Sequence, residues 1–198
     1  MGEVTSGGTL DRREVVAKLL ADRKKLLVVT GLGSATYDVM AAGDNDNNYY
    51  LWAAMGSAAM VGLGLATARP DYSVVVVTGD GEMMMGFGAL ATISLRKPAN
   101  LTIAVLDNGR FGETGMQVSH AGRGISLDGV AKTCGFSWTN EIRDMAGVDD
   151  LRKRLYTRDG VKLATVKITA ENPPRVLPPR DGVYIKNRFR AALGHAPI

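Results

Sequence analysis

The stretch Val74-Val75-Val76-Val77-Thr78-Gly79-Asp80-Gly81-Glu82 decides the fold of this chain. Four consecutive β-branched residues predict a strand that is buried on both faces, which is typical of parallel sheets. Gly79 and Gly81 follow the strand and allow a ligand to approach the backbone closely. We expect a helix from Glu82 to Leu95, and the free N–H groups at its start favour a phosphate.

Asp80 lies between these two glycines and would repel a phosphate unless a hard cation separated them. A second predicted strand, Leu101 to Leu106, ends in Asp107-Asn108-Gly109. Neighbouring parallel strands end at the same edge of the sheet, where open α/β sheets bind ligands. We therefore expect Asp80 and Asn108 to hold Mg²⁺ together, with the Arg110 carbonyl turned to the same ion by a bend at Gly109. The sequence predicts a diphosphate–magnesium clamp.

Composition places the chain among ordinary globular proteins. Its 198 residues are 45% hydrophobic and 22% charged, which suits one sizeable domain. We expect a single α/β domain over 1–198, an open and mostly parallel sheet with helices on both faces and a core at about 11–170. The net charge of +4 is mild, and no basic run with interleaved aromatics indicates nucleic-acid binding.

Cysteine usage and hydropathy bear on the compartment. The single Cys134 excludes an internal disulfide and favours a reducing environment. No stretch approaches the ~20 apolar residues of a membrane span, and the N-terminus lacks an apolar signal core. We therefore expect a cytoplasmic protein that does not enter a membrane.

The remaining segments follow the same alternation of strand and helix. Residues 1–9 are polar and expected to be frayed, and 43–50 are expected to form a solvated polar loop. Apolar spacing predicts helices over 11–22, 58–68, 125–135 and 149–157, and buried strands over 26–30 and 161–168. The Pro-rich segment 171–183 should run extended into a short basic helix at 184–193, docked on another chain or free in solvent.

A second phosphate loop follows the strand at 26–30. Gly31-Leu32-Gly33-Ser34 resembles half of a dinucleotide fingerprint, but the third Gly is missing, and so is the acidic residue after the next strand. Two phosphate loops at one sheet edge fit a diphosphate better than a nicotinamide cofactor. A plain nucleotide-binding domain is therefore disfavoured.

The order strand, Gly79-Asp80-Gly81, 26 further residues and Asn108 resembles the diphosphate-binding domain of the thiamine diphosphate enzymes. The resemblance implies thiamine diphosphate and Mg²⁺ as cofactors, with metal ligands at Asp80, Asn108 and the Arg110 carbonyl. It implies cofactor contacts at Gly33, Ser34, Gly79, Asp80, Gly81, Glu82, Asn108 and Phe111. Where the decarboxylases often carry Ser this chain has Glu82, whose side chain we expect to point away or to cap its own helix.

Ala53 and Met55 precede the small-residue helix at 58–68. Met55 is either a plain core residue or, by the resemblance, the apolar wedge that bends the cofactor between its two rings. The same resemblance assigns the Ala53 carbonyl to the cofactor's aminopyrimidine.

Residues 111–120 are rich in Gly and predict a mobile lid over the site. Glu113 and His120 are its side chains able to act as a general acid or base, so both are candidate catalytic residues, although His120 reads equally well as a surface histidine. Arg110 and Arg123 are candidates for holding an anionic substrate tail.

Within the family, residues 107–117 and 179–189 resemble the small subunit of sulfopyruvate decarboxylase and the matching domain of phosphonopyruvate decarboxylase. This implies decarboxylation of a small anionic 2-oxoacid, a 3-substituted pyruvate, to an aldehyde and CO₂. The family's activating Glu lies on a pyrimidine-binding domain, which we expect on a separate subunit in a dimer of heterodimers. An acetolactate synthase-like carboligase and a non-catalytic thiamine diphosphate-binding subunit remain alternatives. A ferredoxin-linked oxidoreductase often needs cysteine-held clusters, which one Cys cannot build.

Overall fold

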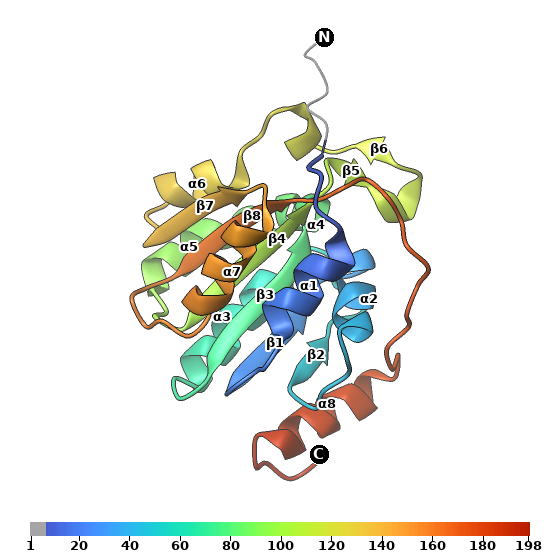
Figure 1. The fold of residues 1–198 in the computed structure, drawn as a ribbon. Coiled ribbons are helices and arrows are strands. Elements are labelled where there is room, and N and C mark those ends of the chain that lie inside the picture. The colour runs from blue at the N-terminus through green and yellow to red at the C-terminus, as the bar shows by residue number, and fades with distance from the viewer. Residues whose placement is uncertain (1–6) are drawn as a thin grey trace.

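The computed structural model describes residues 7–198, so the expectation of a frayed segment at 1–9 falls mostly outside the described residues. Six parallel strands form one open sheet in the order β2-β1-β3-β4-β8-β7 (Figure 1). This confirms the predicted α/β class. The strands are β1 Leu26–Thr30, β2 Asn48–Tyr50, β3 Ser73–Gly79, β4 Leu101–Asp107, β7 Trp138–Ile142 and β8 Lys162–Lys167.

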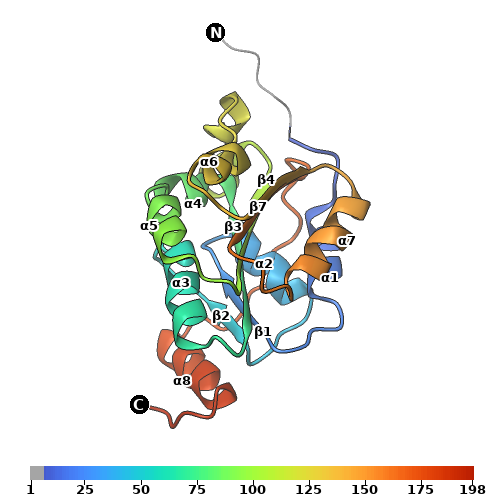
Figure 2. The ribbon, with the colours of Figure 1, turned by 90° about the vertical axis from the view of Figure 1, so that its left-hand side faces the viewer.

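Helices cover both faces of the sheet, as Figure 2 shows edge-on. One face carries α1 (Arg12–Leu20), α2 (Ser34–Ala41) and α7 (Met145–Arg154). The other carries α3 (Ala58–Ala68), α4 (Asp80–Met85), α5 (Ala89–Arg96) and α6 (Leu127–Thr133). A small antiparallel ribbon, β5 (Arg110–Phe111) and β6 (Gln117–Val118), with the short turns η1 (Gly112–Thr114) and η2 (Ala121–Arg123), lies beyond the end of β4.

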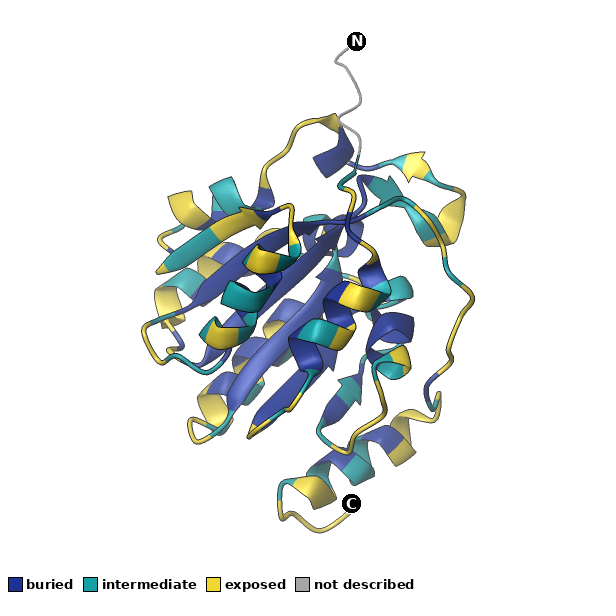
Figure 3. Ribbon diagram, viewed as in Figure 1, coloured by how far each residue is buried: buried dark blue, intermediate teal, exposed yellow. Residues whose placement is uncertain are grey.

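The valine run of β3 is buried on both sides, as predicted. Val75 and Val77 pack with α1, α2 and α7, whereas Val74 and Val76 pack with α3 and α5. This alternation arises because successive side chains of a strand point to opposite faces. The central strands are therefore almost entirely buried, while the outer faces of the helices are exposed (Figure 3).

Two expectations about element boundaries are wrong. The helix expected over 82–95 is two helices, α4 and α5, which are separated at Gly86. A Cβ at Gly86 would lie 2.0 Å from the Gly56 carbonyl oxygen, so the break brings two backbones into contact. Part of the polar loop expected at 43–50 is the edge strand β2.

Strand β7 was not expected from the sequence. It lies at the edge of the sheet, and Asn140 and Glu141 in its middle are exposed, so it lacks the apolar run of a buried strand. Helix α7 begins at Met145, before the expected start at 149, because the Asp144 side chain accepts a hydrogen bond from the Gly147 N–H at 2.8 Å and caps the helix.

The Pro-rich arm is extended, as expected, and α8 (Gly182–Ala192) contacts its own chain, while docking of this arm on another chain stays a prediction. Helix α8 packs beside β2, where Phe189 is buried and meets Tyr49 edge-on with ring centroids 5.4 Å apart. The Trp52 Nε1 donates to the Pro179 carbonyl at 2.9 Å and fixes the end of the arm. The helix thereby covers an edge strand of its own sheet.

Among the described residues, the helices are all too short or too polar to cross a membrane.

Candidate functional site

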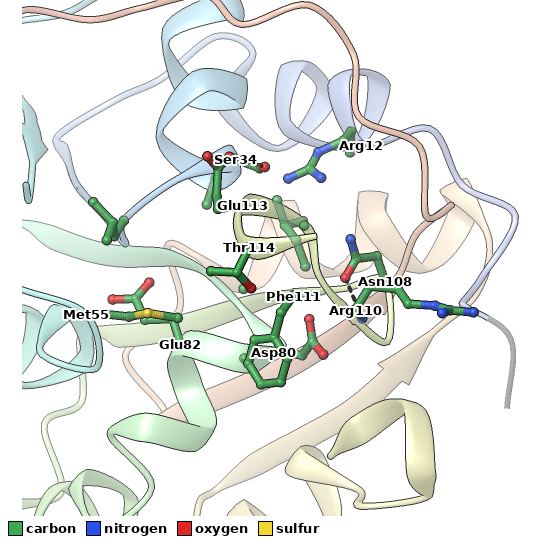
Figure 4. A pocket seen from close by; sticks show the side chains of 16 residues that line it. Arg12, Ser34, Met55, Asp80, Glu82, Asn108, Arg110, Phe111, Glu113 and Thr114 are labelled. Carbon is green, nitrogen blue, oxygen red and sulfur yellow. Dashed lines mark hydrogen bonds between the residues drawn. The ribbon is translucent and has the colours of Figure 1, made fainter. Parts of the chain in front are cut away.

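The candidate site lies where β1 and β3 end side by side. From β1 the chain passes to β2 on one side, and β3 lies on the other, so the strand order reverses at this point. Such switch points form ligand crevices in open α/β sheets. A pocket lies there, and of the residues predicted for the site its lining contains Ser34, Met55, Gly79, Asp80, Gly81, Glu82, Asn108, Arg110, Phe111 and Glu113 (Figure 4). Three others, Gly33, Ala53 and His120, are not part of the lining.

Asp80 is a buried carboxylate at the first position of α4, with a relative exposure of 2%. Its Oδ2 accepts a hydrogen bond from the Ser119 hydroxyl. Burial and the nearby charge of Asp107 raise the pKa of Asp80 to about 6, against the hydrogen bond from Ser119. A cation beside this carboxylate would favour its ionised form, so the electrostatics of the pocket suit a metal ligand.

Asn108 leaves the sheet next to Asp80, because Gly79 and Leu106 are paired in the register of β3 and β4. Both side chains line the pocket, at the ends of these neighbouring strands (Figure 4). The Oδ1 of Asn108 accepts from the Arg110 N–H at 2.9 Å, and Gly109 has a φ of +67°, so the chain bends there as predicted.

The bend is braced by Asp107 and Lys167. The Oδ1 of Asp107 accepts from the Gly109 N–H at 2.8 Å, and its Oδ2 pairs with Lys167 Nζ at 2.6 Å. Both side chains are buried, which makes this a fixed rather than a surface ion pair. The Asp107–Lys167 pair and the hydrogen bond to Gly109 thus fix the position of the loop that carries Asn108.

Among residues 7–198, no group of three or more His, Cys, Asp or Glu side chains is arranged to hold a metal. A cation in this pocket would have one carboxylate, Asp80, and one carboxamide, Asn108, as side-chain ligands. Mg²⁺ is bound in this way when phosphate oxygens and water complete its shell. The donor set therefore fits a magnesium diphosphate.

The loop after β1 faces the same pocket. Gly33 precedes α2 with a φ of +84°, and no side chain caps this helix, so its first N–H groups are available to an anion. A Cβ at Gly33 would lie 2.9 Å from Glu113 Cγ, and the positive φ itself favours glycine here. The Ser34 hydroxyl donates to Glu113 Oε1 at 3.1 Å and joins this loop to the lid.

Glu82 neither points away nor caps its own helix, so that expectation is wrong. Its side chain is buried, and its Oε2 accepts from the Thr78 hydroxyl at 2.7 Å while its Oε1 accepts from the Gly56 N–H at 3.3 Å. Burial raises the pKa of Glu82, although backbone N–H groups, including that of Leu32, act against the rise. A Cβ at Gly31 would collide with Oε2. One carboxylate thus ties the loops after β1 and before α3 to α4.

Met55 and Ala53 stand on the loop that Glu82 holds. Met55 lines the pocket with a relative exposure of 38%, which is unlike a core residue. Ala53 has a φ of +58°, a strained value for a residue with a Cβ, and such strain clusters at functional sites. The carbonyl assigned to Ala53 stays a prediction.

The predicted lid is the ribbon of β5 and β6 with its turns. The Phe111 ring covers Gly81, where a Cβ would lie 2.4 Å from Cε1. Glu113 pairs with Arg175 at 2.9 Å and lines the pocket, so it faces the site. His120 is exposed and packs edge-on to Phe111 with centroids 6.3 Å apart, outside the pocket lining. Its catalytic role stays a prediction.

Of the two arginines suggested for an anionic substrate, Arg110 lines the pocket and Arg123 does not, and the role of each stays a prediction. The Arg110 Nη1 donates to the Met116 carbonyl at 3.3 Å, and Figure 4 shows its guanidinium directed away from the pocket. Arg123 is exposed and does not line the pocket.

Two residues of the site were not predicted from the sequence: Arg12, which lines the pocket, and Ser119, which donates a hydrogen bond to Asp80. Arg12 is one of 24 basic residues, and Ser119 is one Ser in a polar loop, so nothing local marks either. Asp107 stands directly before Asn108, but nothing near it in the sequence indicates its partner Lys167, which is 60 residues away along the chain.

Comparisons with known proteins agree with this geometry. The family model "Thiamine pyrophosphate enzyme, C-terminal TPP binding domain" matches residues 18–158. Sulfopyruvate decarboxylase subunit beta of Methanothermobacter thermautotrophicus is 33% identical over 91% of this chain and 94% of its own length. Phosphonopyruvate decarboxylase of Streptomyces viridochromogenes is 34% identical over 94% of this chain but only 47% of its own length. In other curated relatives the match spans 66% or 35% of the relative.

Among solved structures, the thiamine diphosphate-dependent 4-hydroxybenzoylformate decarboxylase of Rhodococcus jostii RHA1 superposes with a TM-score of 0.68. The two chains are 20% identical, and the match covers 86% of this chain and 35% of that one, so the likeness concerns the fold. The family match spans most of the chain, and the switch-point pocket holds the residues of its fingerprint. The chain therefore belongs to the thiamine pyrophosphate enzymes and carries their C-terminal TPP-binding domain.

Proposed function

We propose that this chain is the diphosphate- and magnesium-binding subunit of a thiamine diphosphate-dependent decarboxylase. Its substrate is a 3-substituted pyruvate of the sulfopyruvate or phosphonopyruvate type, and its products are an aldehyde and CO₂. The observation that carries the proposal is the meeting of Asp80 and Asn108 in one pocket at the switch point, beside the uncapped start of α2. The names of the relatives support the substrate class.

The residues of this chain would hold the cofactor rather than perform its chemistry. Bound thiamine diphosphate supplies an electron sink for the carbon that loses CO₂. Asp80, Asn108 and the Arg110 carbonyl would hold Mg²⁺ against the diphosphate, and the loop at Gly33 and Ser34 would bind the phosphates. Met55 would pack against the cofactor between its two rings.

Glu113 is the better placed of the two candidate acid–base residues. It lines the pocket and is linked to Ser34 and Arg175, so its carboxylate is oriented by two partners. An oriented carboxylate at the pocket wall suits proton transfer to or from a substrate. His120 would have to move into the pocket to take part.

A partner subunit would complete the site. Met55 lines the pocket and is 38% exposed, and three other apolar side chains, Met60, Met85 and Phe87, have relative exposures of 41%, 64% and 36%. The contact between Gly56 and Gly86 brings together the segments that carry Met55, Met85 and Phe87, and we propose that these side chains form one apolar patch. Such patches mark protein interfaces. We propose that a pyrimidine-binding subunit carrying the activating Glu docks here, in a dimer of heterodimers.

The test is to purify the chain with such a subunit and to measure CO₂ release. With thiamine diphosphate and Mg²⁺, we expect sulfopyruvate or phosphonopyruvate to yield CO₂ and the matching aldehyde. The variant Asn108→Ala should lose activity, whereas Asp149→Asn, which removes an exposed carboxylate of α7, should keep it. A complex that binds both cofactors but releases no CO₂ from either acid would refute the proposal. A condensation product in place of the aldehyde would identify a carboligase.

A further inference from the structure

Arg12 is a buried cation whose hydrogen-bonding capacity is largely unused. It is the first residue of α1, with a relative exposure of 4%. Its Nε donates to Asp38 Oδ2 at 2.7 Å. A guanidinium carries five N–H donors, and within residues 7–198 the four on the two terminal nitrogens have no hydrogen-bond acceptor.

The free edge of this guanidinium is directed at the pocket. Arg12 belongs to the pocket lining together with Ser34, Asp80 and Asn108. Figure 4 shows its terminal nitrogens turned toward Ser34. Asp38 is itself buried on α2, with a relative exposure of 1%. Its contact with Nε fixes that edge of the guanidinium, so the two terminal nitrogens are directed into the cavity.

The local charges leave a positive excess at this end of the pocket. Asp38 also lies 2.8 Å from Arg13 Nε, so one carboxylate faces two guanidiniums. Arg13 also donates from Nη2 to the Pro174 carbonyl at 2.8 Å. Glu113, a carboxylate that also lines the pocket, already pairs with Arg175. A buried charge of this kind calls for an anion.

We propose that Arg12 is an anion-binding residue of the pocket and takes a tetrahedral oxyanion on its two terminal nitrogens, beside the Ser34 hydroxyl. A planar guanidinium matches two oxygens of a phosphate, phosphonate or sulfonate at once. The inference rests on the proposed function, which offers two sources of such a group: the terminal phosphate of the cofactor and the acid tail of the substrate.

Calorimetry with the full chain and two probes separates these sources. Inorganic pyrophosphate with Mg²⁺ represents the cofactor's phosphates, and ethylphosphonate represents the substrate's tail. If the phosphate is the ligand, Arg12→Gln should weaken pyrophosphate binding about 10- to 100-fold, as expected for the loss of a charge-assisted pair. If the substrate tail is the ligand, ethylphosphonate should show that loss instead. Arg12→Lys keeps the charge without the fork and should fall between.

The matched control is Lys18→Gln, which removes one positive charge from the same helix at an exposed ion pair with Asp149. It should bind both probes like the wild type. If Arg12→Gln does not fold, because Asp38 is left without its buried partner, the double variant Arg12→Gln/Asp38→Asn removes both charges together and takes its place.

The proposal is overturned if the wild type binds neither probe in the millimolar range, or if the Arg12 variant binds both as well as the Lys18 control does. None of these measurements depends on CO₂ release. An inactive enzyme with an Arg12-dependent anion site would therefore refute the decarboxylase and leave the anion site standing.

Discussion

Replacing Asp80 by Asn should make the metal-free chain more stable while it removes the magnesium site. Burial and Asp107 raise the pKa of Asp80 to about 6 from 3.8, so the ionised form is disfavoured in the folded state. A rise of about 2 units at about 1.4 kcal/mol per unit is a cost of up to about 3 kcal/mol at neutral pH. Asn is nearly the same size, carries no charge and can still accept from Ser119.

The sign of the pH dependence follows from the raised pKa. The stability that Asp80 contributes is fully present below the unfolded value near 4, where the carboxyl is protonated in both states, and is lost as the pH rises through about 6. Asp80→Asn should therefore exceed the wild type in free energy of unfolding at about pH 7.5 and match it near pH 4. Urea denaturation of both proteins in EDTA measures the difference, and the other titrating groups cancel because they are shared.

A contrasting variant is available in the same loop. Asp107 is equally buried, but it pairs with Lys167 at 2.6 Å, so Asp107→Asn should destabilise the chain by about 3–5 kcal/mol. With Mg²⁺ and thiamine diphosphate present in the full complex, the wild type should gain stability and Asp80→Asn should gain none. An Asp80→Asn chain that is no more stable than the wild type at neutral pH would show that Asp80 is not a strained carboxylate, and the electrostatic reasoning would fail.

Three further outcomes are expected. Ser119→Ala removes a hydrogen bond that lowers the pKa of Asp80, so calorimetry should find weaker Mg²⁺ binding by the complex near pH 6 and a smaller loss near pH 8; equal losses at both pH values would contradict this. Phe189→Ala empties a buried contact under α8 and should cost about 3–5 kcal/mol in urea unfolding, whereas the exposed Tyr184→Ala should cost little. Gly86→Ala places a Cβ 2.0 Å from a backbone oxygen and should cost about 1–3 kcal/mol or more, while Gly88→Ala, which meets nothing within 4 Å, should not.

Much of the fold could be predicted because its signals are local. The apolar runs of β3 and of the strand at 101–107 are enough to predict buried parallel strands. The glycines around Asp80 and the bend at Gly109 can also be predicted, because a few neighbouring residues in the sequence are enough to indicate a turn or a close backbone approach. Even the meeting of Asp80 with Asn108 follows once two parallel strands are assigned, since parallel strands end at one edge.

What the sequence by itself determined, then, is the open parallel sheet, the edge at which its strands end, and the placement of Asp80 and Asn108 at the ends of two neighbouring strands. Only the tertiary structure decided the direction of Glu82, the burial of Arg12 against Asp38, the exposed edge strand β7 and the packing of α8 on β2. Each of these depends on which residues far apart in the chain come into contact. Spacing and periodicity in the sequence indicate which residues share a face of one strand or helix. The partner of a buried charge depends on how separate helices and strands pack against each other, and the sequence pattern does not contain that information.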